Sequence, residues 1–365
     1  MRVLLISNGS GEDRIAVQLA RAWRMVEPEL ELEALVLVGE GLFYQRAGIE
    51  LLPPRFNPPS QGFAYLHPDL LWQDVCAGLG RHLRQSLDCL KARRGHYTAV
   101  LAVGDIVAAF AASRLHQPFA FYGSALSDYY LGQAGEAGKS SYDSLQIRLL
   151  RSALVFARDA LTAANLRRRG LNAHFDGNPM LDCFDDPSGD YLDGPSGECP
   201  YRPDPTHPAI LLLPGSHADA PANFGLMLRQ LMPLLDQPLD YLLIQAPQLT
   251  AESLPAVLRS NGWDSTASYW MRGQARLWLL DTGWFRQAID WGRLAIGLAG
   301  TANEQCVGLG LPVISFATPG HQYSWAFGEA QQRLLGAGLQ FLGDPHPQLL
   351  AWQVKRMLAE PGYRA

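Results

Sequence analysis

Apolar runs of strand length recur along the first half of the chain, separated by longer segments with helical periodicity. Each run is apolar at nearly every position and does not alternate with polar residues, which is typical of parallel strands covered on both faces. The expected strands are residues 2–8, 32–39, 98–105, 118–124, 153–159 and 173–179.

The intervening segments predict helices. In residues 13–26, Ile15, Leu19, Ala22 and Val26 fall on one face of a helix, and residues 69–90 show a similar pattern. Parallel strands joined through helices favour right-handed crossovers. The first half therefore predicts a doubly wound α/β domain.

The same pattern resumes in the second half, after residues 183–208, which are rich in Pro, Gly and Asp and carry no periodicity. The expected strands are residues 209–216, 240–247, 275–281, 294–300 and 312–318. We predict an α/β protein with two doubly wound, Rossmann-like domains that face a cleft. The boundaries are 1–182 for the first domain, 183–208 for a linker, 209–345 for the second domain and 346–365 for a C-terminal helix. The sequence does not indicate which of the two domains this helix packs against.

Composition narrows the class of protein. A chain of 365 residues with 48% hydrophobic and 18% charged residues is typical of a globular protein of two domains. A net charge of −5 argues against nucleic-acid binding. The five cysteines form no C-x-x-C, the histidines show no metal-ligand spacing, and no signal peptide is evident. We therefore expect a cytoplasmic protein with reduced thiols and no metal site.

Three strand–helix junctions carry candidate binding residues. Between residues 7 and 14, Ser10, Gly11 and Glu12 form a loop that reads either as a plain turn or as a ligand loop. A dinucleotide fingerprint would need a third glycine where Arg14 stands, so a nicotinamide-dependent dehydrogenase is disfavoured.

The junction after residues 209–213 contains Gly215, Ser216 and His217. Small residues and a hydroxyl at this point favour contact with phosphate oxygens. His217 either donates to such a phosphate or is a solvated loop residue.

The junction after residues 294–299 opens a helix with small and polar residues where a connecting helix usually becomes apolar. Glycine permits close approach, the threonine donates to an anion, and Glu304 can accept hydrogen bonds from the vicinal hydroxyls of a ribose. The alternative is a capping box between Thr301 and Glu304. The candidate donor-binding residues are Gly300, Thr301, Ala302, Asn303, Glu304 and Gln305.

Two further positions complete the set. Gln322, after the strand at residues 312–318, is expected to bind sugar hydroxyls. Asp105, at the end of a first-domain strand, is either a general base or the cap of the following helix at Val107. Loops that follow neighbouring strands would together accept a diphosphate, a ribose and a sugar, which is a nucleotide-sugar.

At these residues the chain resembles the lipid-A-disaccharide synthase family. Leu211–Ala220 (LLLPGSHADA) resembles the family's LLPGSR segment, Gly297–Val313 resembles its SGTATLE segment, and Phe175–Asp182 (FDGNPMLD) resembles its VGHPLVD. The agreement runs from Arg2 to about Gly336. The resemblance implies a GT-B glycosyltransferase that binds a UDP-sugar in its C-terminal domain and an acceptor in its N-terminal domain.

The chain departs from the family at defined positions. His217 replaces the family's arginine, Glu304 and Gln305 stand where the family has Leu and Glu, and Asp105 matches an acidic residue whose following A-P-D-F is absent. The peptidoglycan N-acetylglucosaminyl transferase is similar in architecture and uses a glutamine near the position of Gln322.

The resulting hypothesis is a hexosyltransferase that transfers the sugar of a UDP-sugar to an acceptor hydroxyl. The transfer inverts the configuration of the anomeric carbon, needs no metal or cofactor, and uses Asp105 as the base. Residues 51–72, rich in Pro, aromatics and leucine, are either a surface loop or a contact for a lipid or glycolipid acceptor at the inner face of the membrane. A UDP-sugar 2-epimerase and a non-catalytic nucleotide-sugar-binding protein are the alternatives. The donor sugar, the acceptor and the oligomeric state are left open.

Overall fold

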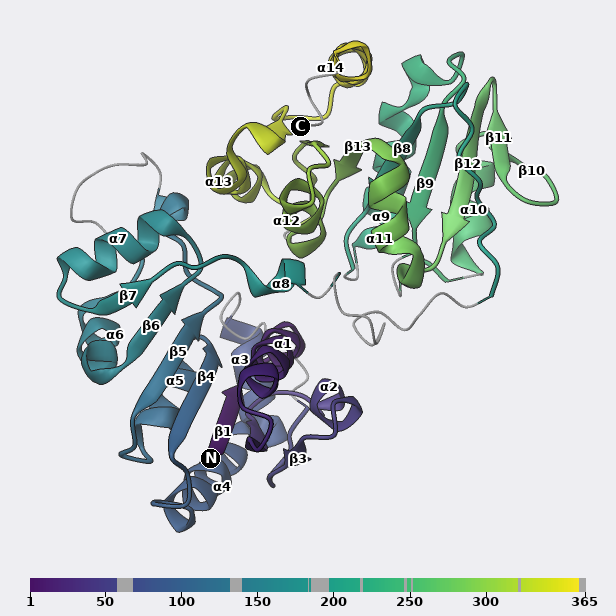
Figure 1. Cartoon of the computed structure of the whole chain (residues 1–365). Helices are drawn as coiled ribbons and strands as arrows, with labels where there is room; N and C mark the ends of the chain where they lie inside the picture. Colours follow the sequence, from purple (N-terminus) through teal and green to yellow (C-terminus); the bar gives the residue numbers. More distant parts are fainter. Residues whose placement is uncertain are drawn as a thin grey trace. The chain divides into compact units, whose positions relative to one another are not determined.

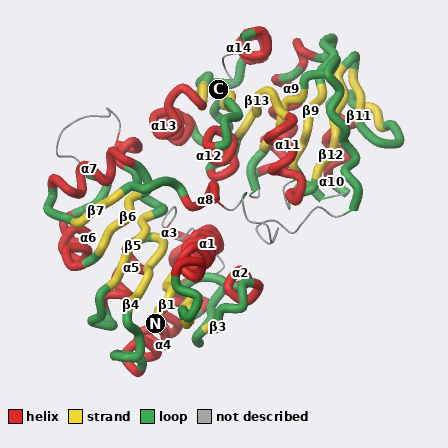
Figure 2. Tube along the Cα trace, viewed as in Figure 1, coloured by secondary structure: helices red, strands yellow, loops and turns green. Residues whose placement is uncertain are grey.

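The chain divides into two compact units, Met1–Cys183 (unit 1) and Phe184–Ala365 (unit 2). Both are built from parallel strands that alternate with helices, as Figures 1 and 2 show for each unit. The computed structural model describes residues 1–57, 68–131, 140–182, 184, 197–216, 219–245, 248–250, 252–320 and 323–360.

The described part of unit 1 contains a seven-stranded sheet in the order β3-β2-β1-β4-β5-β6-β7, with every neighbouring pair parallel. Its strands are β1 (Arg2–Ser7), β2 (Glu31–Val36), β3 (Glu50–Leu51), β4 (Ala99–Gly104), β5 (Phe119–Gly123), β6 (Leu154–Ala157) and β7 (Asn172–His174). Its helices are α1 (Ser10–Val26), α2 (Leu42–Arg46), α3 (Pro68–Ala77), α4 (Leu79–Ala92), α5 (Ile106–Ser113), α6 (Ser144–Leu149), α7 (Ala160–Arg168) and α8 (Pro179–Asp182).

Each face of this sheet has its own hydrophobic core because successive residues of a strand point to opposite faces. Leu4 and Ile6 of β1 pack with residues of α4, α5, α6 and α7 on one face. Val3 and Leu5 pack with α1 and α2 on the other. Helices cover both faces of the sheet, which explains why its strands are apolar on both faces.

The described part of unit 2 contains an eight-stranded sheet in the order β10-β11-β12-β9-β8-β13-β14-β15. The strands from β12 to β15 in this order are parallel, whereas β10 and β11 are antiparallel to their neighbours. The strands are β8 (Ala209–Leu213), β9 (Asp240–Ile244), β10 (Asp264–Ser265), β11 (Trp270–Arg272), β12 (Ala275–Leu280), β13 (Gly292–Gly297), β14 (Val313–Ser315) and β15 (Leu339–Phe341). The helices are α9 (Ala220–Gln230), α10 (Ser253–Ser260), α11 (Phe285–Trp291), α12 (Thr301–Gly308), α13 (Trp325–Leu335) and α14 (Pro347–Ala359).

Unit 2 also carries one core on each face of its sheet. Helices α9, α10 and α14 cover the face to which Ile210 and Leu212 belong, and α11 and α12 cover the face of Leu211 and Leu213. The C-terminal helix α14 packs against α9 and β13, which answers the question of which half of the chain it joins.

Two features differ from the expected elements. The helix expected over residues 69–90 is two helices, α3 and α4, because Gly78 between them adopts a left-handed backbone conformation with φ of 111°. Residues 197–208, within the expected linker, are part of unit 2, where Tyr201 is buried with residues of β8 and α11.

Candidate functional site

Three loops adjoin at the carboxyl end of the unit 2 sheet. Strands β8 and β14 are both neighbours of β13, so the loops that follow them flank the start of α12. A Cβ added to Gly215 would lie 3.0 Å from the carbonyl oxygen of Leu298, and one added to Gly320 would lie 2.6 Å from Oδ2 of Asp219. The structure therefore brings together the loops that the sequence assigns to one binding site.

Helix α12 begins without a side-chain cap. Gly300 occupies the N-cap position and has no side chain with which to make a capping hydrogen bond. Thr301 is the first helical residue and is exposed, so the capping box with Glu304 is not formed. The first N–H groups of a helix lack intrahelical partners and carry positive potential, which makes this end suited to an anion.

A buried network of side-chain hydrogen bonds fixes the start of α12. Asn303 is fully buried, and its amide donates to Oε1 of Gln331 (2.9 Å) and to the carbonyl oxygen of Gly297 (3.2 Å). Gln331 in turn donates to the carbonyl oxygen of Gly300 (2.9 Å) and accepts from the hydroxyl of Tyr323 (2.7 Å). Asn303, a predicted donor-binding residue, thus fixes the loop in this structure, while Gln331 was not singled out by sequence.

The remaining predicted residues of α12 are placed as follows. Ala302 is half-buried, whereas Glu304 and Gln305 are only 8% and 5% exposed, and both have interaction partners. The carboxylate expected to meet a ribose is therefore a largely buried group in the first turn of the helix.

The loop after β8 needs its glycine. Gly215 has φ of 93°, in the left-handed region that other residues rarely adopt, and Ser216 beside it is exposed. The side-chain amide of Asn223 in α9 donates to the carbonyl oxygen of Pro214 (3.1 Å) and fixes the loop. The predicted residues His217 and Gln322 lie outside the described residues.

In unit 1, Asp105 stands between β4 and α5 as the N-cap of the helix. Its carboxylate accepts a hydrogen bond from the backbone N–H of Val107 at 2.8 Å, so the capping interpretation is confirmed. Burial raises the pKa of Asp105, and hydrogen bonds from Val107, Ala108 and Asn8 oppose that rise. A raised pKa also improves a carboxylate as a proton acceptor at neutral pH.

The predicted loop residue Glu12 lies in the same part of unit 1. Its Oε1 accepts from the hydroxyl of Ser124, which follows β5, at 2.9 Å. A Cβ on Gly104 would lie 1.8 Å from Oδ1 of Asn8 and 3.2 Å from Cγ of Glu12, so these side chains cross the end of β4 beside Asp105. Helix α1 begins at Ser10 and includes Gly11.

A buried chain of hydroxyls beneath this loop was not predicted from sequence. The hydroxyl of Tyr44 donates to Oγ of Ser7 (2.8 Å), and Ser7 donates to Oδ1 of Asp13 (2.6 Å). Asp13 is 2% exposed, and burial raises its pKa to about 7. This chain joins β1, α1 and α2.

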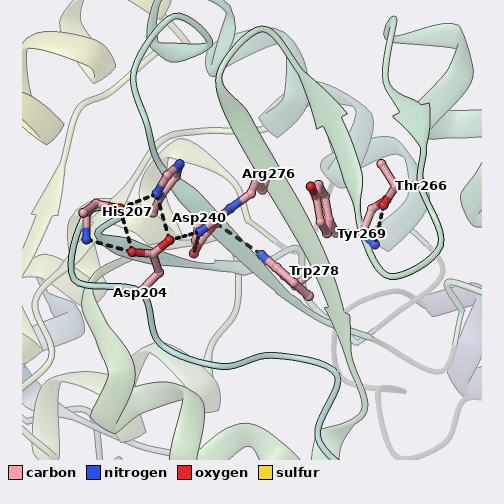
Figure 3. A network of polar contacts seen from close by, with 8 residues as sticks. Asp204, His207, Asp240, Thr266, Tyr269, Arg276 and Trp278 are labelled. Atoms are coloured by element: carbon pink, nitrogen blue, oxygen red, sulfur yellow. Dashed lines mark hydrogen bonds and ion pairs between the residues drawn. The ribbon is translucent and has the colours of Figure 1, made fainter.

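The amino-terminal end of the unit 2 sheet carries a second polar network (Figure 3). Asp240, the first residue of β9, is fully buried, and Arg276 of β12 contacts both of its oxygens at 2.6 and 2.8 Å. The indole N–H of Trp278 donates to the same carboxylate at 3.2 Å. Arg276 also contacts Asp204 at 3.0 Å, and Asp204 lies 3.1 Å from His207, so the network fastens residues 204–207 to the sheet.

Several kinds of feature are absent from the described residues. No group of three or more His, Cys, Asp or Glu residues among them is placed to hold a metal ion. The cysteines that the structure describes, Cys76, Cys89, Cys199 and Cys306, are free. In the same part of the chain, no helix combines the length and apolar character needed to cross a membrane.

The likeness of this chain to known proteins lies in its fold. No family model matches the chain, and no curated protein matches it in sequence. Solved structures do match along its whole length. UDP-GlcNAc 2-epimerase from Neisseria meningitidis, bound to UDP-GlcNAc, aligns with 100% of this chain and 93% of its own, with a TM-score of 0.60 and 13% identity.

Two further structures match the chain equally far. MurG from Acinetobacter baumannii aligns over 100% of this chain and 92% of its own, with a TM-score of 0.54 and 13% identity. CalG4, the calicheamicin glycosyltransferase, aligns over 100% and 91%, with a TM-score of 0.59 and 14% identity.

These likenesses define the class of fold. The chain has two Rossmann-like α/β domains with parallel sheets, as in GT-B glycosyltransferases and UDP-GlcNAc 2-epimerases, so the predicted fold class is confirmed. The narrower resemblance to lipid-A-disaccharide synthase rests on the sequence motifs alone.

Proposed function

We propose that the protein is a glycosyltransferase that takes its sugar from a UDP-sugar. The observation that carries this proposal is the uncapped start of α12, held in place by Asn303 and Gln331 at the carboxyl end of β13. Its support comes from whole-chain likeness to enzymes solved with UDP or UDP-GlcNAc.

One half of the donor site binds the anionic diphosphate of the ligand, and the other half binds its hydroxyl groups. The N–H groups at Gly300 and Thr301 and the loop at Gly215 and Ser216 bind the diphosphate. Glu304, with Gln305, accepts hydrogen bonds from the ribose hydroxyls. His217 and Gln322 keep their sequence-based assignments to phosphate and sugar.

The chemistry is a displacement at the anomeric carbon. The acceptor hydroxyl oxygen forms a bond to this carbon on the face opposite UDP, the bond from the carbon to the phosphate oxygen breaks, and UDP leaves with the electron pair. Asp105 takes the hydroxyl proton. The α12 dipole stabilises the charge that develops on UDP, and the configuration of the sugar inverts.

Titration calorimetry of the purified protein with UDP, GDP, NAD, UDP-glucose and UDP-GlcNAc tests the donor class. We expect UDP and a UDP-sugar to bind, and Glu304→Gln to weaken both about tenfold or more, since it removes a charged acceptor. Asp264→Asn, an exposed position in β10, is the matched control and leaves binding unchanged. Failure of every uridine nucleotide to bind would refute the proposal.

A UDP-sugar 2-epimerase is the second candidate. Two observations favour it: epimerases recur among the matching structures, and unit 1 holds two carboxyl groups of raised pKa, Asp13 and Asp105. An epimerase converts UDP-GlcNAc to its C2 epimer without any acceptor, whereas a transferase releases UDP only when an acceptor hydroxyl is present. NMR analysis of UDP-GlcNAc incubated alone separates the two.

The acceptor is the least constrained part of the proposal. A lipid or glycolipid, as in lipid-A-disaccharide synthase, accords with the sequence motifs and with the exposed Trp72 and Val75 of α3. Peripheral contact with the inner face of a membrane then follows, and residues 58–67 of the expected contact segment lie outside the described residues. Flotation with vesicles of phosphatidylethanolamine and phosphatidylglycerol tests this extension, and absence of co-flotation would remove it.

A further inference from the structure

Asp219, in the loop between β8 and α9, carries a carboxylate without a partner. Both of its side-chain oxygens are shielded from solvent, and no described residue donates a hydrogen bond to them. It occupies the N-cap position of α9 but makes no capping hydrogen bond. A carboxylate removed from water without a donor destabilises the folded state, so its retention calls for a ligand or a structural reason.

The described residues around Asp219 supply no structural reason. The carboxylate lies against Gly320 of the loop after β14, where an added Cβ would be 2.6 Å from Oδ2. The hydroxyl of Thr318, which would lie 3.4 Å from the same added Cβ, donates to the carbonyl oxygen of Tyr323 at 3.3 Å. The side-chain amide of Asn223, one turn into α9, donates to the carbonyl oxygen of Pro214 and not to Asp219.

The position of the carboxylate restricts what it can bind. Strand β13 lies between β8 and β14, so Asp219 and Gly320 belong to the two loops that flank the start of α12. A phosphate bound at α12 would be repelled by a neighbouring carboxylate, which only accepts hydrogen bonds. A hydroxyl pair, in contrast, donates two hydrogen bonds to one carboxylate without bringing negative charge.

We propose that Asp219 binds hydroxyl groups of the transferred sugar in the nucleotide-sugar, an inference that rests on the proposed donor site. The uncapped helix takes the diphosphate, and the unpartnered carboxylate beside it takes the sugar. Asp219 thereby distinguishes the UDP-sugar from the UDP product, because only the sugar supplies its missing donors. A sugar without the matching hydroxyl leaves the carboxylate unpaired and is rejected strongly.

Calorimetry on the full chain tests this with UDP, UDP-glucose and UDP-GlcNAc as probes. We expect Asp219→Asn to weaken the better-bound of the two UDP-sugars at least tenfold and to change the dissociation constant of UDP less than twofold. Gly320→Ala, which displaces the carboxylate without removing it, should give the same selective loss. Asp264→Asn is the control for a removed surface charge.

A second measurement distinguishes a binding group from a structural one. Without ligand, Asp219→Asn should melt at the same temperature as the wild type or higher, because an unpaired charge whose oxygens are shielded from solvent is removed. A lower melting temperature, together with an equal loss of UDP and UDP-sugar affinity, would assign Asp219 to the fold and overturn the inference.

The remaining outcomes separate this inference from the proposed function. Wild-type binding of UDP and a UDP-sugar that Asp219→Asn leaves intact would overturn the role of Asp219 alone. If the wild type binds no uridine nucleotide, both ideas fail together. Wild-type UDP affinity that rises with MgCl₂, with the rise lost in Asp219→Asn, would show a cation at this carboxylate and also overturn the sugar assignment.

Discussion

Each end of the unit 2 sheet carries an aspartate whose carboxylate is shielded from solvent, but the two carboxylates differ in their hydrogen-bond donors. At the amino-terminal end, Asp240 receives two contacts from Arg276 and one from the indole of Trp278. At the carboxyl end, Asp219 receives none from the described residues. Since the same sheet supports both, the difference is not one of fold: the first carboxylate is satisfied by the protein, and the second is left for a ligand.

The comparison extends to the groups around each carboxylate. The amino-terminal network contains donors and acceptors in matched pairs and ties residues 204–207 to β9 and β12 (Figure 3). At the carboxyl end, the first N–H groups of α12 have no partner within the helix, and the carboxylate oxygens of Asp219 have no donor among the described residues. A ligand with an anionic part and a hydroxyl-bearing part complements both.

Removal of Arg276 should have the largest effect on stability, because it leaves the carboxylate of Asp240 without its main hydrogen-bond donor. Arg276→Met leaves Asp240 buried without its counter-charge, and we expect a loss of about 3–5 kcal/mol in the free energy of unfolding, measured by urea denaturation. Arg293→Met, at an exposed position of β13, is the control. Addition of Asp240→Asn should recover part of the loss, and a change below about 1 kcal/mol would contradict the contrast.

Asp13 of unit 1 is another buried aspartate, and its carboxyl group accepts a hydrogen bond from the hydroxyl of Ser7. Its pKa is about 7 in the folded protein, against about 3.9 in an unfolded chain. Between these values the folded state keeps a proton that the unfolded state has released, so stability falls as pH rises from about 4 to 7 and then levels.

Asp13→Asn should remove this slope. At pH of about 8 we expect the variant to be more stable than the wild type by up to about 4 kcal/mol, and at pH of about 4 to be similar. Urea denaturation across this pH range measures the difference. Parallel curves for the two proteins would show that Asp13 ionises normally in the fold.

The smallest effect is expected at the support of the carboxyl end. Gln331→Leu removes the donor to Gly300 and the acceptor for Asn303, which should lower the free energy of unfolding by about 1–3 kcal/mol. Because the start of α12 loses its support, UDP affinity should also fall, by about tenfold in calorimetry. Gln332→Leu removes a hydrogen bond to Phe341 from the same helix and should leave UDP affinity unchanged.

Much of the fold was accessible from sequence because its central strands are apolar on both faces. The antiparallel pair β10 and β11 was missed, since strands of two and three residues with polar positions carry no periodic pattern. The single helix expected over residues 69–90 was wrong at Gly78, whose positive φ interrupts it. Local pattern identifies elements, but a break of this kind depends on the backbone conformation of one residue.

The site was accessible only in part. Gly215, Gly300 and Thr301 follow strands directly, so their placement depends on chain order. The partners of Asn303 and Ser7 lie 28 and 37 residues away, at Gln331 and Tyr44, and no spacing rule predicts such pairs. Whether the carboxylate of Asp219 finds a donor likewise depends on tertiary packing.

The outer strands of the two sheets have a consequence for association with other chains. Among the described residues, the edge strands β3, β7, β10 and β15 are only two or three residues long. A strand exposed at an edge recruits further strands through its unpaired backbone groups, and short edges offer few of them. Each sheet therefore presents little template for edge-to-edge aggregation, and any assembly between copies has to be built from side-chain surfaces.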